Sequence, residues 1–326
     1  MSTLVLNLFC ETRRLVRRSF SEGGSFSEGG SGVRKMQVRR PVVAGQFYPA
    51  ASAECKMEVE EYLAEGALPA ELPEKIVGGI VPHAGWTFSG QLAALVFAAI
   101  KKQNVKVDTF CIFGAAHRYF GPAPAVYDSG AWQTPLGNID IDEDLAQAIL
   151  KTGSAIADAN AHRGEHSIEV QVPFIQHLFP DAKILPIITP PDEAVIELGT
   201  AVGKIIGETK DKKIVCIGST DLTHYGPNYG FEPAGQGYDA FKWASEVNDK
   251  QFIDLALKIE PQKMLDTAAR NYNACGAGAA AAVAAAAKKL GRTKGLLLAH
   301  TNSNAIMVEK FSSSSADSVG YAAIVF

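Results

Sequence analysis

The chain has 326 residues, of which 47% are hydrophobic and 20% charged, close to the average of soluble globular proteins. Its net charge of −4 argues against partners that need a basic surface, so neither nucleic acid nor a membrane is an expected partner. The longest apolar run, at 277–287, is alanine-rich and shorter than the roughly 20 residues of a membrane-spanning helix.

The first 38 residues differ in composition from the rest. Four arginines and one acid stand in residues 1–20, and the sequence Ser-Phe-Ser-Glu-Gly-Gly begins at both Ser19 and Ser25. Gly/Ser-rich segments behave as flexible chains, so we predict a disordered extension over 1–38 and one folded domain over 39–326. An Arg-rich, acid-poor start is also typical of a mitochondrial presequence, which makes the mitochondrion the alternative to a cytoplasmic location.

From Arg39 onward, short apolar strands alternate with helices. The predicted strands are 76–81, 107–113, 182–188, 214–218, 295–299 and 319–326, with a hairpin over 130–141. The predicted helices are 91–102, 142–151, 167–179, 193–206, 238–258, 261–269 and 275–290. This alternation is typical of a single-domain α/β fold with a mostly parallel sheet and helices on both faces.

The cysteines favour a reducing compartment. There are five of them, an odd number, and they are scattered without a C-x-x-C pair. Cys111 and Cys216 lie inside apolar strand-like runs, where a free thiol behaves as a small hydrophobic side chain. We therefore expect no disulfides and a cytoplasmic protein.

Polar side chains gather where three of the predicted strands end. His83, His117 and His224 each follow a strand within a few residues, and Asp221 lies in the same loop as His224. Ligands of open parallel sheets bind beyond the carboxyl ends of the strands, so these residues predict a metal-binding pocket at that edge. The alternative for each histidine is a loop residue bonded to the backbone, and Asp221 alone could cap a turn.

Cys275 is predicted to open a helix, where the positive end of the helix dipole favours the thiolate that binds metals. An equally good explanation is a small residue that allows close helix packing, as Gly276 and Gly278 suggest. The run Gly276-Ala-Gly-Ala-Ala-Ala281 matches a dinucleotide fingerprint, but no strand precedes it, so we reject that function. The sequence also lacks a P-loop and a G-x-S-x-G elbow, which disfavours nucleotide hydrolysis and an α/β-hydrolase.

The remaining histidines give weaker signals. His177 and His300 are expected to be structural, and His162 to sit in a polar loop. His166 and Glu169 lie near the start of a predicted helix, where capping explains them slightly better than support of a ligand.

With these residues assembled, the chain resembles the MEMO1 family, called AmmeMemoRadiSam system protein B in prokaryotes. The resemblance runs from about Arg40 to the C-terminus and rests on the order and spacing of several motifs. They are Ala44-Gly-Gln-Phe-Tyr48, Pro82-His-Ala-Gly85, Gly114-Ala-Ala-His117, Glu165-His-Ser-Ile-Glu169, Ser219-Thr-Asp-Leu-Thr-His224, Asn273-Ala-Cys-Gly276 and Ser318-Val-Gly-Tyr-Ala-Ala323. The family is similar in fold to the class III extradiol dioxygenases, which hold non-haem Fe(II).

The resemblance implies that His83, His117 and Cys275 correspond to metal-coordinating residues. It places Asp221 and His224 in the same pocket, with His224 as the acid/base. Two imidazoles and one anionic ligand suit iron(II); a thiolate makes copper plausible as well, and zinc also accepts these ligands. Asp221 would then orient His224 or support a ligating histidine.

Two positions depart from the family pattern. The chain reads Gly114-Ala-Ala-His-Arg118, with one histidine where the family usually has two. After Cys275 it has Gly276-Ala277, whereas the family usually carries an arginine, a donor that would bind an anion. These departures put a shared substrate in doubt.

Two functions follow from the resemblance. The first is a mononuclear-metal, dioxygenase-like oxidoreductase acting on an unidentified small molecule, with a metallohydrolase as a weaker variant. The second is a non-catalytic adaptor that uses the pocket to recognise a peptide or protein, because eukaryotic members are regarded as adaptors. Prokaryotic members are named with a radical-SAM partner, so a radical-SAM or signalling protein is the expected partner class. Whether the chain is an enzyme stays open at this point.

Overall fold

The computed structural model describes residues 37–104 and 106–326. Nearly all of the extension predicted over 1–38 therefore lies outside the described residues. Val38, assigned to that extension, pairs with Ala131 in the short strand β1 (Val38–Arg39). The described fold thus includes the last two residues that the sequence assigns to the extension.

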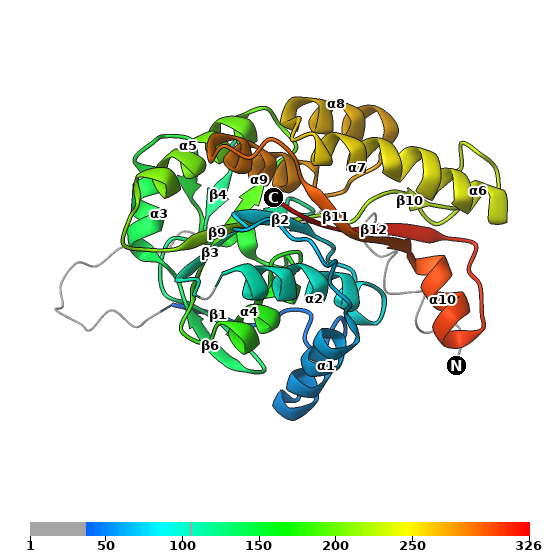
Figure 1. Cartoon of the computed structure of the whole chain (residues 1–326), viewed down its shortest axis with the longest axis horizontal. Helices are drawn as coiled ribbons and strands as arrows, with labels where there is room; N and C mark the ends of the chain where they lie inside the picture. The colour runs from blue at the N-terminus through cyan, green and yellow to red at the C-terminus, as the bar shows by residue number, and fades with distance from the viewer. Residues whose placement is uncertain (1–36, 105) are drawn as a thin grey trace, which may run out of the picture. The chain divides into compact units, whose positions relative to one another are not determined.

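A mixed sheet forms the centre of the described domain (Figure 1). Within residues 37–104 and 106–326 it has nine strands, in the order β10-β12-β2-β9-β3-β8-β4-β7, with β11 paired to β12. The strands are β2 (Gly78–Val81), β3 (Thr109–Ala115), β4 (Ala125–Val126), β7 (Ile156–Ala157), β8 (Lys183–Thr189), β9 (Ile214–Ser219), β10 (His224–Tyr225), β11 (Leu296–Asn302) and β12 (Ser318–Val325).

The sheet is parallel in its centre and antiparallel toward its edges. Strands β2, β9, β3 and β8 are parallel neighbours, as the apolar runs predict. The prediction of a mostly parallel sheet needs correction at the edges, because β12 runs antiparallel to β2, β10 and β11, and β4 runs antiparallel to β8. A C-terminal hairpin-like pair carries no crossover helix, so it joins the sheet antiparallel.

Helices cover both faces of this sheet (Figure 1). A β-carbon on Gly78 would meet Val283 of α9, whereas one on the adjacent Gly79 would meet Val96 of α2, so these helices lie on opposite faces. Helices α5 and α8 pack on α9, and α1 and α4 pack on α2. The bounds are α1 (Ser52–Glu65), α2 (Trp86–Gln103), α3 (Glu143–Leu150), α4 (Val172–Leu178), α5 (Ala194–Glu208), α6 (Tyr238–Trp243), α7 (Lys250–Leu257), α8 (Pro261–Asn271), α9 (Ala277–Lys289) and α10 (Ser303–Phe311).

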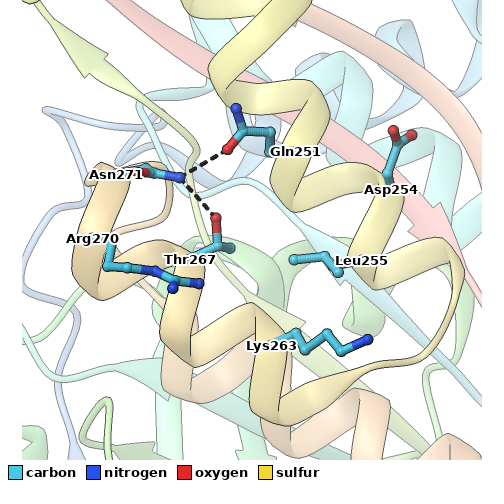
Figure 2. Close-up of a pocket in the computed structure, with 7 residues that line it drawn as sticks. All are labelled: Gln251, Asp254, Leu255, Lys263, Thr267, Arg270 and Asn271. Carbon is cyan, nitrogen blue, oxygen red and sulfur yellow. Dashed lines mark hydrogen bonds between the residues drawn. The ribbon is translucent and has the colours of Figure 1, made fainter.

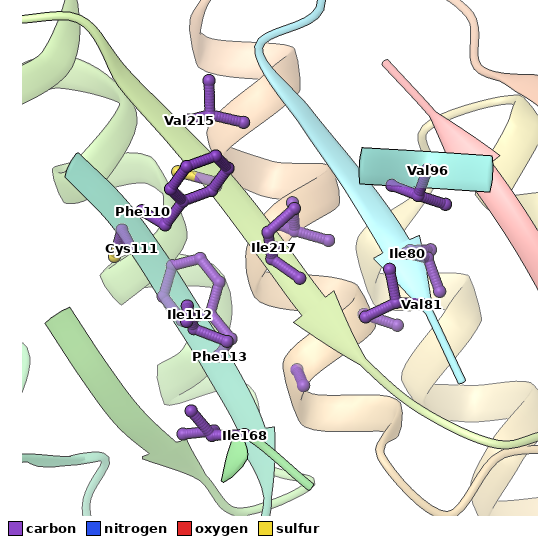
Figure 3. Packing of buried hydrophobic residues seen from close by; sticks show 14 of the residues in the cluster. Ile80, Val81, Val96, Phe110, Cys111, Ile112, Phe113, Ile168, Val215 and Ile217 are labelled. Atoms are coloured by element: carbon purple, nitrogen blue, oxygen red, sulfur yellow. The ribbon is translucent and has the colours of Figure 1, made fainter. Parts of the chain in front are cut away.

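The core lies between the central strands and these helices (Figure 3). All seven residues of β3 are buried, because helices cover both of its faces and both sets of alternating side chains pack inward. Cys111 of β3 is in register with Cys216 of β9, and both are free and buried. They pack as small hydrophobic residues, as predicted.

Helix α9 explains the glycines around Cys275. A β-carbon on Gly276 would overlap the carbonyl oxygen of Ser219, and one on Gly278 would lie 2.5 Å from that of Thr189. The helix therefore approaches the strand ends so closely that only glycine fits there. The prediction that Cys275 opens the helix is corrected, since α9 begins at Ala277 and Cys275 stands in the turn before it.

Other element boundaries differ for identifiable reasons. The helix predicted over 167–179 is a 3-10 turn, η4 (Glu169–Gln171), followed by α4, because Pro173 fits only in the first turn of an α-helix. Helix α2 begins at Trp86 rather than at residue 91, since burial of that indole outweighs the weak helix propensity of the residues around it. Helices α1 and α10 escaped prediction because they bury only three residues and one residue, respectively.

A second, smaller sheet lies beside the hairpin. Strands β5 (Ala131–Thr134) and β6 (Gly137–Asp140) form the hairpin predicted over 130–141, and β1 pairs parallel to β5. Over the part of the chain that is described, no helix combines the length and apolarity needed to span a bilayer.

Candidate metal centre

The predicted site residues follow three adjacent parallel strands. Strand β9 lies between β2 and β3, so the loops after all three meet at one edge. His83 comes two residues after β2, His117 two residues after β3, and Asp221 two residues after β9. The structure thus brings together the loops that the sequence analysis singled out.

His83 is 2% exposed, and its tautomer is fixed. The Ser219 hydroxyl donates to the Ser167 carbonyl (2.7 Å), so it accepts a hydrogen bond from His83 Nδ1 (3.0 Å). His83 Nε2 therefore carries the lone pair, and it lies 3.2 Å from Cys275 Sγ. Burial, followed by the charges of His117 and His166, holds the pKa of His83 well below its usual range, so the ring is neutral and free to bind a cation.

Asp221 ties His83 to the Cys275 turn. Its Oδ1 accepts a hydrogen bond from His83 N (2.7 Å), its Oδ2 lies 4.0 Å from His83 Nε2, and its carbonyl accepts one from Cys275 N (3.2 Å). Burial raises the pKa of Asp221 to about 7, although backbone N–H groups favour its carboxylate. Donor atoms of His83, Asp221 and Cys275 all lie within 4.8 Å of one another. Asp221 thus supports a candidate ligand rather than His224.

His117 is held by Glu165, which the sequence analysis gave no role. Glu165 Oε1 accepts from His117 Nδ1 (3.0 Å), and Oε2 accepts from His117 N (3.1 Å). Although burial lowers it, the pKa of His117 ends well above its usual value, because Cys275 and Glu165 favour the charged ring. The side chain is 30% exposed, so His117 is the candidate ligand open to solvent.

His166 belongs to the same cluster, contrary to the slight preference for a capping role. Donor atoms of His83, His117 and His166 lie within 4.8 Å of one another. The His117 and His166 rings are stacked at an interplanar angle of 4°, and both stand nearly perpendicular to the His83 ring. The motif Glu165-His-Ser could have signalled this arrangement, since all three of its residues contact the histidines or their supports.

His224 lies near the cluster but outside both donor groups found among the described residues. Its Nδ1 donates to the Leu222 carbonyl (3.0 Å), which leaves Nε2 as an acceptor. Burial lowers the pKa of His224 to about 4, and the charge of His117 lowers it further. His224 is therefore a neutral base at neutral pH.

A π-helical turn, η5 (Ala244–Asp249), braces the two loops behind the site. Asn248 Nδ2 donates to Thr223 Oγ1 (3.0 Å) and to the Asn271 carbonyl (2.9 Å). Asp249 accepts from Thr223 N (2.9 Å) and pairs with His300 (3.0 Å). Such turns often occur at functional sites, and this one links the His224 loop to the Cys275 turn.

His162 is not in a polar loop, as the sequence suggested, but is fully buried in the 3-10 turn η3 (Ala159–His162). Its Nε2 donates to the Ala125 carbonyl (3.1 Å), and the Trp132 and Tyr127 rings pack against it. Burial and the charge of Arg39 lower the pKa of His162 to about 3. His162 is thus a neutral core residue that the polar sequence around it concealed.

This burial predicts a loss of stability in mild acid. Between the unfolded pKa near 6.5 and the folded pKa of about 3, only the unfolded chain takes up a proton on His162. We expect His162 to make the free energy of unfolding about 2 kcal/mol lower at pH 5 than at pH 7. Urea unfolding of wild type and His162→Gln at both pH values measures this. His177→Gln on α4 is the matched control and should keep the wild-type difference; the same difference in all three proteins would contradict the assignment.

A separate surface hollow of about 320 Å³ lies between α7 and α8 (Figure 2). Asn271 bonds Gln251 and Thr267 across it, and charged side chains such as Arg270 and Lys263 line it. Its lining contains no histidine or cysteine. It therefore has none of the donors discussed above.

The chemistry of the clustered donors fits a transition-metal ion. Two imidazoles have their Nδ1 atoms engaged by Ser219 and Glu165, which is the usual support of metal-ligating histidines. A thiol and a carboxyl group complete the set. Nitrogen and sulfur donors suit iron, copper or zinc better than magnesium or calcium.

Comparison with known proteins gives consistent matches over nearly the whole described fold. A family model described as "Memo-like protein" matches residues 39–325. A "MEMO1 family protein" of Methanosarcina mazei is 37% identical over 295 residues, covering 89% of this chain and 99% of that protein. Another of Thermococcus onnurineus is 38% identical over 298 residues with the same coverage, and one of Methanopyrus kandleri is 35% identical over 302 residues, covering 88% and 98%.

Proposed function

This chain belongs to the MEMO1 (Memo-like) family, and we propose that its pocket around His83 binds one transition-metal ion for an oxidative reaction. The observation that carries the proposal is the unprotonated Nε2 of His83, buried and 3.2 Å from Cys275 Sγ. A buried, uncharged imidazole facing a thiol is a poor structural device, because neither group gains an ion pair. It is a good pair of ligands for a soft or borderline metal.

Iron(II) is the metal we favour, with copper second and zinc as the non-redox alternative. His83, His117 and Cys275 would hold the ion, and Asp221 would act beside His83. A thiolate in place of a carboxylate softens the site, which moves its preference from iron toward copper. When bound, an iron or copper ion would supply open positions for a substrate and dioxygen together.

The chain's own residues provide for proton transfer next to that position. His224 is neutral and presents Nε2 as a base, because its Nδ1 is engaged by Leu222. A positioned base of this kind typically contributes about 10²- to 10⁴-fold to a rate. His224 is therefore the acid/base that we assign to a dioxygenase-like reaction.

One observation favours the second candidate function, an adaptor without turnover. Phe120, three residues after His117, is 93% exposed, and a large exposed aromatic side chain beside a pocket is typical of a contact surface for a peptide or protein. In this alternative the same loops would recognise a partner, such as a radical-SAM or signalling protein, independently of metal.

The two functions are separated by removing one thiol. Cys275→Ala should lower the affinity for Fe(II) and Cu(I) at least about 10-fold under anaerobic conditions and abolish oxygen uptake with any substrate found. Cys55→Ala, which removes a buried thiol of α1, is the matched control and should behave as wild type. Unchanged metal affinity in Cys275→Ala would contradict the metal assignment, and partner capture retained by that variant would favour the adaptor.

A further inference from the structure

We infer that His166 is a metal ligand, and that with His83 and His117 it forms a three-imidazole site that binds a borderline divalent cation without Cys275. This inference rests on the proposed metal-binding function and specifies its ligands. It assigns the pocket two ligand sets that share His83: a nitrogen set completed by His117 and His166, and a sulfur-containing set with Asp221 and Cys275.

The geometry of the three imidazoles carries the first step. Their donor atoms lie within 4.8 Å of one another. The His117 and His166 ring centroids are 5.0 Å apart, and those rings stand at 84° and 88° to His83. Three rings arranged around one small volume can direct nitrogen lone pairs at a common ion with modest side-chain rotation.

The hydrogen bonds of the rings carry the second step. His83 and His117 each use Nδ1 on a neighbouring side chain, so each keeps Nε2 for a ligand. The His166 Nδ1 lies 3.7 Å from Glu165 Oε1, which is longer than a hydrogen bond. The ring is instead held by packing, with His117 stacked on it and the Phe47 ring 4.8 Å away. Packing fixes the position of His166 while leaving its nitrogens for an ion.

A capping role explains His166 less well than ligation does. The residue satisfies its local backbone through N–H, which donates to Glu165 Oε1 (2.9 Å), and this bond needs no imidazole. The side chain is 23% exposed, so core packing does not require an aromatic ring there either. Its orientation toward two other histidines is thus best explained by a shared cation.

Ligand softness then separates the two sets. Three neutral imidazoles with an open position are a usual set for Zn(II), whereas thiolate selects Cu(I). Because both sets use His83, the pocket would hold one ion at a time. The Glu165 carboxylate, whose pKa is held well below its usual value chiefly by His117 against the effect of burial, offsets part of the cation's charge next to the nitrogen set.

The test is a double dissociation with Zn(II) and Cu(I) as probes, added to metal-free full-length protein under anaerobic conditions. His166→Ala should weaken Zn(II) binding at least about 10-fold and change Cu(I) binding less than about 3-fold, and Cys275→Ala should do the reverse. Co(II) in place of Zn(II) should lack thiolate-to-metal charge-transfer absorption in wild type. His166→Gln guards against misfolding, and His177→Ala controls for loss of a histidine elsewhere.

Three outcomes would overturn the inference. Unchanged Zn(II) affinity in a folded His166 variant removes His166 from the ligands, and an equal loss for both metals means a single mixed set. A strong charge-transfer band for Co(II) would place Cys275 on the divalent ion. If wild type binds none of the three metals, the proposed function fails as well, which distinguishes that failure from the others.

Discussion

Replacing His83 by alanine is expected to lower the affinity for Fe(II), Cu(I) and Zn(II) by more than about 100-fold, the largest functional effect of any single substitution. The reason is that His83 belongs to both groups of candidate donors, which otherwise share no member. Groups that merely orient a metal ligand typically contribute about 10- to 100-fold to affinity, so loss of a shared ligand should exceed that range. Competitive titration against a chromophoric chelator measures it.

A weaker change at the same place grades this prediction. Ser219→Ala removes the acceptor of His83 Nδ1 but keeps the imidazole, so affinity should fall about 10- to 100-fold. His300→Gln, which alters a histidine paired with Asp249 behind the site, is the control and should retain most of the wild-type affinity. Affinity retained by a folded His83→Ala protein would mean that the ion binds elsewhere.

The second large effect concerns stability. Glu169, for which the sequence suggested capping, instead anchors the segment before α1. Its carboxylate accepts hydrogen bonds from Arg39 (2.8 Å), from the backbone N–H groups of Val42 and Val43, and from the Tyr48 hydroxyl (3.0 Å). Both members of its ion pair with Arg39 are largely buried. Such a carboxylate cannot be replaced by water when it is removed.

Glu169→Gln should lower the free energy of unfolding by about 3–5 kcal/mol, the usual cost of breaking a buried ion pair. The new amide would direct a donor at groups that are all donors, and Arg39 would keep a buried charge without its partner. This loss is a large fraction of the 5–15 kcal/mol that stabilises a typical domain. Urea unfolding monitored by circular dichroism measures it.

An exposed ion pair provides the matched control for Glu169→Gln. Lys250 and Asp254 form an i,i+4 pair on α7 that is accessible to solvent, and Asp254→Asn should cost less than about 0.5 kcal/mol. Similar losses in the two variants would show that burial does not set the value of the Glu169 contacts.

The parallel centre of the fold was predictable because strands buried on both faces appear as continuous apolar runs. The four central strands and the hairpin were found in this way. Helices α1 and α10 were not, since they bury few side chains and so show little apolar periodicity. The antiparallel pairing of β12 with β2 depends on tertiary packing at the edge, which no local pattern encodes.

The location of the site was predictable, but its internal connections were not. Strand ends followed by histidines marked the loops of His83 and His117 correctly. The sequence could not show that Glu165 would face His117 or that Ser219 would fix the His83 tautomer, because these contacts join residues about 50 and 136 positions apart. His166 was undervalued for the same reason, since its neighbours His83 and Phe47 are distant in sequence.

The most direct test of the metal pocket is elemental analysis of the full-length wild-type protein purified without oxygen. The arrangement of His83, His117, Asp221, His166 and Cys275 predicts about one iron or copper ion per chain, or uptake of one ion when Fe(II) or Cu(I) is added. A protein that is folded, contains no metal and takes up none of the added ions would contradict the account.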